Sequence, residues 1–165
     1  MKLIRKDGDE FEFEFEPVEK GLLFHLLGLY PAVPVSYHKL TKGRRIPHEA
    51  ENQELLNEAI RSQREENQKE IVALLKDAGR FKDGEESTRA VFQRGELEWL
   101  LQVLNDVRVG NWLAAGSPDP QQEGKMRRDK KSIQHVMLME LTGGFQMLFL
   151  GSLDGTLKPG DEEEI

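Results

Sequence analysis

Cysteine is missing from the sequence, and its absence excludes several kinds of chemistry at once. A chain without a thiol has no disulfide, no thiolate ligand for a metal ion and no cysteine nucleophile. Because disulfides are typical of proteins in oxidising compartments, a cytoplasmic location is the simpler expectation.

Long apolar runs are also missing. The first residues contain no apolar stretch of the roughly 7–15 residues that a secretory signal needs. The most apolar segment, residues 136–150, contains Glu140 and two glycines. It is shorter than the roughly 20 apolar residues that span a bilayer. We therefore expect a buried core helix there, and no membrane partner.

The chain has no excess of positive charge. It carries 30 acidic residues against 23 basic ones, a net charge of −7. Because binding to phosphate backbones needs a basic face, a nucleic-acid partner is not expected. Two basic runs, residues 39–45 and 125–131, stand out locally. They are open to three interpretations: solvated charge, a binding patch, or pairing with acidic residues of the long helix described below.

Familiar catalytic motifs are absent as well. The sequence contains no phosphate-binding loop, no dinucleotide-binding glycine motif and no nucleophile elbow. Its four histidines are His25, His38, His48 and His135. None follows a glutamate by three residues and no two are four apart, so the common helical metal-ligand pairs are missing. We expect no catalytic residue, no metal ion and no other cofactor.

The sequence does contain a clear strand pattern near its start. Phe11, Phe13 and Phe15 alternate with glutamates, which is typical of a strand with one buried face. The Asp7-Gly8 turn signal separates this run from a short apolar pair before it. We therefore predict an N-terminal β-hairpin whose phenylalanines pack on helices. Residues 89–92 are a candidate third short strand.

Helical periodicity accounts for most of the remaining chain. Apolar residues at helical spacing, together with proline and glycine at the ends, predict helices at about residues 17–30, 48–78, 94–115 and 129–153. The predicted fold class is mainly α (α+β), a bundle of about four helices with the N-terminal hairpin. Residues 1–153 form one domain in this prediction, and residues 154–165 form an acidic disordered tail.

The second of these helices is too long for a compact domain. A straight helix over residues 48–78 measures about 46 Å, whereas a globular chain of this size is about 40 Å across. Its middle, residues 63–70, is polar on every face. We expect this helix to protrude, to bend near residues 63–67, or to bind a second copy of the chain along its length.

One polar group interrupts the apolar pattern of the third helix. It consists of Asn105, Asp106 and Arg108, followed by Asn111 and Trp112. In one interpretation these residues form a hydrogen-bond network that fixes helix packing or caps a neighbouring loop. In the other they line a pocket where Asp106 acts as acid or base and Arg108 holds an anion. The absence of a nearby nucleophile favours the structural interpretation.

The same group carries a resemblance to a known family. The Leu-Asn-Asp-Val-Arg stretch from Leu104 to Arg108, after a long charged helix, resembles uncharacterised bacterial proteins known mainly from actinobacteria. The similar region runs from Gln53 to Trp112, while the hairpin and the Gly-Asn-Trp continuation depart from the family pattern. The resemblance implies a distant, helical member with no assigned catalytic residues. Members are often encoded near an adaptor of an ATP-dependent protease, which implies a link to protein quality control.

These observations lead to two functional hypotheses. The first is a non-enzymatic intracellular protein-interaction or regulatory domain, with a protein partner or self-association through the long helix. The alternative is a small-molecule-binding protein or enzyme with a polar pocket around Asp106 and Arg108.

Overall fold

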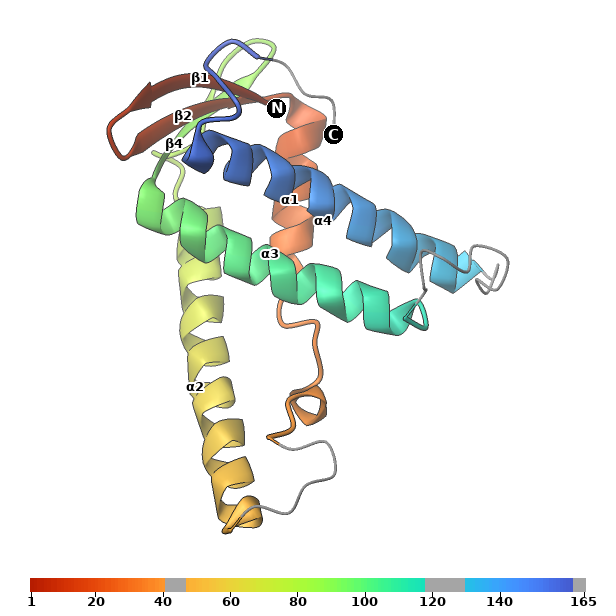
Figure 1. Cartoon of the computed structure of the whole chain (residues 1–165). Coiled ribbons are helices and arrows are strands. Elements are labelled where there is room, and N and C mark those ends of the chain that lie inside the picture. The colour runs from red at the N-terminus through yellow and green to blue at the C-terminus, as the bar shows by residue number, and fades with distance from the viewer. Residues whose placement is uncertain (41–46, 118–129, 162–165) are drawn as a thin grey trace.

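A computed structural model describes residues 1–40, 47–117 and 130–161 of the chain. Within these ranges the chain forms four β-strands, four α-helices and one short 3₁₀ helix. The fold is α+β, with an antiparallel sheet on one side of the helices (Figure 1). The helices and the N-terminal hairpin agree with the sequence prediction. The sheet is larger than predicted, because it has four strands.

The sheet is built on the predicted hairpin. Strands β1 (Lys2–Asp7) and β2 (Glu10–Phe15) pair antiparallel. Strand β4 (Thr88–Gln93) pairs antiparallel with β2 and confirms the candidate third strand. Strand β3 (Lys82–Asp83) completes the order β1-β2-β4-β3. The sequence did not predict β3, because two exposed residues carry no hydrophobic pattern.

Phenylalanines cover the inner face of the sheet. Phe11, Phe13 and Phe15 are each 0% exposed, as the alternation with glutamate predicts. The Phe13 ring meets Phe92 of β4 and Phe149 of the last helix edge-on, with centroid distances of 6.1 and 5.5 Å. Edge-to-face contacts at this distance are favourable beyond the burial of area. The prediction that the hairpin packs on a helix is therefore confirmed.

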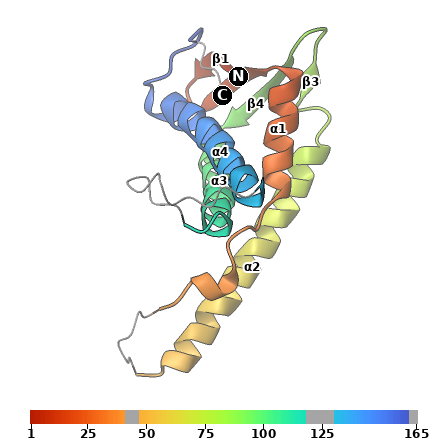
Figure 2. The same cartoon turned by 90° about the vertical axis from the view of Figure 1, so that its right-hand side faces the viewer.

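Three helices lie under this face. They are α1 (Pro17–Gly28), α3 (Arg94–Ala114) and α4 (Lys130–Asp154). Reciprocal capping boxes at Glu16 and Gln93 begin α1 and α3 and satisfy free backbone N–H groups there. Helices α3 and α4 pack side by side along most of their length, and α1 crosses beside them (Figures 1 and 2). Leu100, Leu104 and Leu148 belong to the core between them.

Helix α4 is long and apolar enough to cross a membrane by length and composition alone. However, 39% of the residues in its most apolar stretch are buried, and Phe145 and Phe149 are completely inaccessible to solvent. The core helix of a globular domain has the same properties. Its outer face exposes Met137, Met147 and Leu150.

Helix α2 (Glu49–Lys76) leaves the rest of the molecule. Its amino-terminal half extends well beyond the other helices. Among the described residues, it is accompanied only by the segment that contains the 3₁₀ helix η1 (Val35–Tyr37) (Figures 1 and 2). Only Asn67, Ile71 and Leu74 of its 28 residues are buried. The helix has no marked bend in these views, so the bend expected near residues 63–67 is wrong. The excess length is accommodated by protrusion.

Residues 155–161 belong to the predicted acidic tail, and the structure places them against the body of the molecule. Leu157 is 6% exposed, and its backbone N–H donates to the Gly151 carbonyl. The Gly160 N–H donates to the Leu3 carbonyl at 2.9 Å. Residues 162–165 lie outside the described residues, as do residues 41–45 and 125–129 of the two basic runs.

Candidate functional site

Asp106 holds the loop that follows α1. Its side chain is 17% exposed, and its Oδ1 atom accepts hydrogen bonds from the backbone N–H groups of Ala32 (2.6 Å) and Val33 (3.1 Å). Hydrogen bonds to an ionised acceptor are shorter and stronger than neutral ones. The carboxylate therefore fixes the loop, which is the role that the structural interpretation requires.

Arg64 of α2 binds the same loop and lies close to Asp106. Its Nη2 atom donates to the Val33 carbonyl at 2.5 Å and lies 3.6 Å from Asp106 Oδ2. The arginine side chain is only 12% exposed. Val33 is thus bound through its N–H by α3 and through its carbonyl by α2. These polar groups tie α2 to the body at the level where it begins to protrude.

A second set of polar contacts lies next to this pair. Asn67 of α2 donates to the Tyr30 hydroxyl at 2.9 Å and accepts from Trp99 Nε1 at 3.2 Å. Burial raises the pKa of Tyr30; the Asn67 hydrogen bond opposes that rise, and the Asp106 charge adds to it. Tyr30 therefore remains a neutral hydrogen-bonding group at physiological pH rather than a base.

We name these residues together the polar junction. It consists of Tyr30, Ala32, Val33, Arg64, Asn67, Trp99 and Asp106. Helices α2 and α3 and the loop after α1 all contribute, and the donors and acceptors largely satisfy one another. A network of this kind specifies a packing geometry.

The predicted site residues do not converge on one pocket. Asn105 and Arg108 are exposed, and the Arg108 guanidinium lies over Gly143 of α4. Asn111 is buried. Its Nδ2 atom donates to the Val107 carbonyl at 2.8 Å, and its Oδ1 atom lies 2.8 Å from His135 Nδ1. Trp112 is half-buried. Residues two apart on a helix point to different sides, so Asp106 faces the loop while Arg108 faces α4.

Sequence reasoning missed Tyr30, Arg64, Asn67 and Trp99. A signal for two of them was present, because Arg64 and Asn67 continue the helical spacing of Ile60 and Ile71. The inward face of α2 could have been traced through them as a polar section of an otherwise apolar stripe. Tyr30 and Trp99 reach the junction only through tertiary packing, which the sequence does not display.

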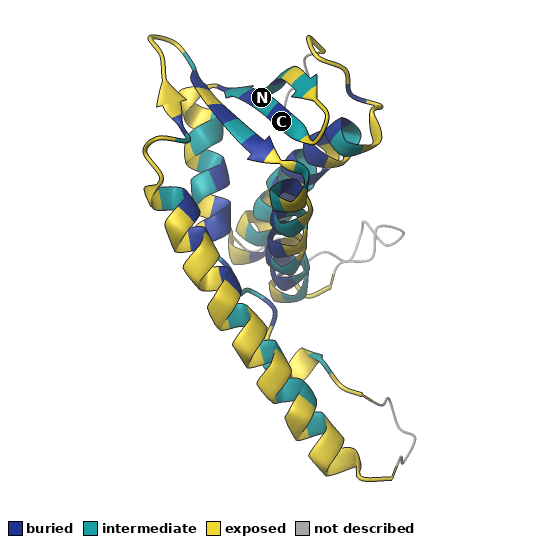
Figure 3. Ribbon diagram, turned by 90° about the vertical axis from the view of Figure 1, so that its left-hand side faces the viewer, coloured by how far each residue is buried: buried dark blue, intermediate teal, exposed yellow. Residues whose placement is uncertain are grey.

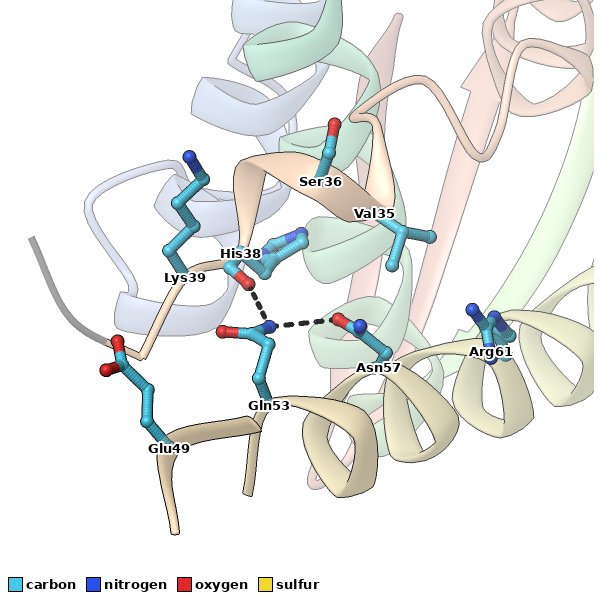
Figure 4. Close-up of a pocket in the computed structure, with 8 residues that line it drawn as sticks. All are labelled: Val35, Ser36, His38, Lys39, Glu49, Gln53, Asn57 and Arg61. Atoms are coloured by element: carbon cyan, nitrogen blue, oxygen red, sulfur yellow. Dashed lines mark hydrogen bonds between the residues drawn. The ribbon is translucent and has the colours of Figure 1, made fainter. Parts of the chain in front are cut away.

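An open groove of about 440 Å³ lies between η1 and the start of α2 (Figure 4). Its lining residues are Val35, Ser36, His38, Lys39, Glu49, Gln53, Asn57 and Arg61. Within the groove, Gln53 Nε2 donates to the His38 carbonyl at 2.8 Å and to Asn57 Oδ1 at 3.0 Å. Its carbonyl oxygen accepts from the Leu40 N–H at 3.0 Å. These contacts hold the returning segment against α2.

A second groove of about 360 Å³ lies where the carboxyl end of α2 meets α3. It contains an ion pair between Arg80 and Glu96, with Nη2 and Oε1 2.7 Å apart. Burial raises the pKa of Glu96, but hydrogen bonds from Arg80 and from the Gln93 N–H outweigh burial and lower it overall. Glu96 is therefore ionised at neutral pH and unsuited to act as a general acid. Asp106 and Arg108 line neither groove.

Metal binding finds no support in the part of the chain that the structure describes. Those residues contain no cluster of three or more histidine, aspartate or glutamate side chains able to hold an ion. Comparison of the chain with protein-family models, with curated proteins and with solved structures gives no match.

Proposed function

We propose that this chain is a non-enzymatic intracellular protein-interaction domain that works through the exposed side of α2. The observation that carries this proposal is the exposure of the helix. Only three of the 28 residues of α2 are buried, so this helix contributes little to the hydrophobic core of the chain. Long helices normally gain stability by packing an apolar face, so a helix this exposed is suited to bind another protein.

The polar junction supports the same function. Arg64, Asn67 and Asp106 hold the base of the protruding helix in one orientation. A surface fixed before binding loses less conformational entropy when a partner docks. In this proposal the interaction serves protein quality control, because the sequence resembles proteins encoded near a protease adaptor.

The alternative, a small-molecule site at Asp106 and Arg108, has less support. The two side chains face different neighbours, and Asp106 Oδ1 is already engaged by two backbone donors. A ligand there would have to displace the loop residues Ala32 and Val33.

Photo-crosslinking in cells tests the proposal. A photoreactive amino acid at the exposed Ser62 position of α2 should give covalent adducts with protein, whether a second copy or another chain. The control is the same group at Val18, which is 69% exposed on α1. Adducts from Val18 but none from Ser62 would overturn the proposal.

A further inference from the structure

Eight residues on the outer side of α2 follow a heptad spacing. They are Glu51, Leu55, Glu58, Ser62, Glu65, Lys69, Val72 and Lys76, and all are exposed. Steps of four and three alternate without interruption, so the eight side chains lie along one side of the helix. Figure 3 shows this side of α2 as a nearly continuous exposed surface. We call these eight residues the outer stripe.

The outer stripe is complementary to itself when it is reversed. About a midpoint between residues 63 and 64, Glu58 is the counterpart of Lys69, and Glu51 is the counterpart of Lys76. Each pair has opposite charges. The same operation relates Leu55 to Val72, the two aliphatic residues of the stripe.

We infer that the outer stripe binds a second copy of this chain as an antiparallel helix pair. The inference rests on the proposed function and names its partner. In a two-fold symmetric contact, if residue i meets residue j, then j meets i. One antiparallel register thus forms the Glu58–Lys69 and Glu51–Lys76 ion pairs twice each, and the Leu55–Val72 contact twice. A parallel pair would instead place like charges together along the helix.

The side chains involved are available for this contact. Leu55 is 65% and Val72 48% exposed. Glu58, Lys69 and Lys76 make no ion pair with any residue that the structure describes. The Glu51 carboxylate lies 3.1 Å from Nδ1 of the exposed His48 ring. Association would bury the aliphatic side chains and give the charges their partners.

The described part of the rest of the molecule lies away from the outer stripe. Asn67, Ile71 and Leu74 attach α2 to the body from the side opposite the outer stripe. In Figures 1 and 3 the sheet and the other helices lie on that attached side. Two antiparallel copies therefore place their bodies at opposite ends and on opposite sides of the helix pair.

The composition of the contact sets its strength. Only the Leu55–Val72 contacts are apolar, and exposed ion pairs contribute little each and are screened by salt. We therefore expect association at micromolar concentration that weakens as ionic strength rises.

Cysteine crosslinking tests the antiparallel register, because the native chain has no cysteine. A Leu55→Cys protein mixed with a Val72→Cys protein should form a covalent heterodimer under mild oxidation. Either variant alone should not, because positions 55 and 72 are about 26 Å apart along one helix and a disulfide needs Cα atoms about 4.4–6.8 Å apart. Leu55→Cys mixed with Val18→Cys is the matched control, with no product expected.

A charge exchange gives a second, independent readout. Glu58→Lys alone should raise the dimer dissociation constant at least about tenfold. In this variant the lysine at position 58 of each copy lies opposite Lys69 of the other copy, so two pairs of like charges face each other. Lys69→Glu alone should do the same. The combined Glu58→Lys and Lys69→Glu protein has the native net charge and should return to within about threefold of the native constant. Light scattering or sedimentation at tens of micromolar measures these constants, and circular dichroism confirms that each variant is folded.

The results separate this inference from the proposed function. Self-crosslinking of Leu55→Cys would show a parallel pair and overturn the inference. A monomeric mass at tens of micromolar, or a dimer that gives no covalent product in the mixture, would overturn it too. In those cases crosslinks from the Ser62 position to another protein would leave the proposed function intact. The absence of such crosslinks would overturn both the inference and the proposed function.

Discussion

The carboxylate of Asp106 is the single group on which the polar junction depends most. It accepts two backbone hydrogen bonds from the loop after α1 and lies next to Arg64. Loss of the negative charge weakens the hydrogen bonds of the Ala32 and Val33 N–H groups and removes the ionic partner of Arg64. The cost of an unsatisfied buried donor is about 1–3 kcal/mol.

We therefore expect Asp106→Asn to lower the free energy of unfolding by about 1–3 kcal/mol. Urea denaturation measures this value. The neighbouring Asn105 is exposed, and Asn105→Ala should change stability by less than about 0.5 kcal/mol. An Asp106→Asn protein with native stability but altered binding of a metabolite would instead favour the small-molecule alternative.

Gly110 is required by a close approach of α3 to the same loop. A Cβ atom at this position would lie 2.3 Å from Ala32 Cβ and 2.6 Å from the Ala32 carbonyl carbon. Because backbone atoms cannot move aside as a side chain does, Gly110→Ala should destabilise the protein by about 1–3 kcal/mol. Gly21→Ala in α1 has open space around it and should stabilise by about 0.5–1 kcal/mol. Thermal unfolding of both variants tests this contrast, and equal effects would contradict it.

At the scale of elements, the aromatic face of the hairpin joins it to the helices. Phe13 is completely buried between β4 and α4. We expect Phe13→Ala to cost about 3–5 kcal/mol. Glu12→Ala, on the opposite face of β2, provides the comparison and should have a small effect. A shared denaturation midpoint for native protein and Phe13→Ala would disprove the packing argument.

The elements that the sequence predicted are those with a strong internal period. The alternation at Phe11, Phe13 and Phe15 and the helical spacing in α3 were sufficient to place them correctly. Strand β3 has two exposed residues and no such pattern. The path of α2 was underdetermined for a different reason, because its polar middle could either bend or face solvent.

The candidate site was harder to predict than the elements. Asn105, Asp106 and Arg108 are close in sequence, yet only Asp106 enters the polar junction. Its actual partners, Ala32, Val33 and Arg64, come from other elements. Contacts between distant segments depend on how helices cross, and one sequence does not record this.

At the scale of the whole molecule, stability should vary along α2. Its carboxyl-terminal half includes the buried Ile71 and Leu74, whereas its amino-terminal half contacts mainly the η1 segment through Gln53. Regions with few buried apolar contacts open locally at low free energy. In dilute protein we therefore expect amide hydrogens of residues 53–60 to exchange faster than those of residues 68–75. Hydrogen exchange with mass spectrometry measures this, and equal protection of both halves would show that the protruding half is stabilised as strongly as the body.

The four-stranded sheet has a consequence for behaviour at high concentration. One edge strand, β3, has two residues, and the other, β1, is irregular between Leu3 and Arg5 and exposes Arg5 and Asp7. Short, charged or irregular edges discourage strand addition between molecules, which is a common start of amyloid-like aggregation. The glutamates on the outer face of β2 form ion pairs with Arg5 and Arg89, so this face is charged rather than apolar. Crowding of this protein should therefore leave its β-sheet content unchanged and should not seed fibrils.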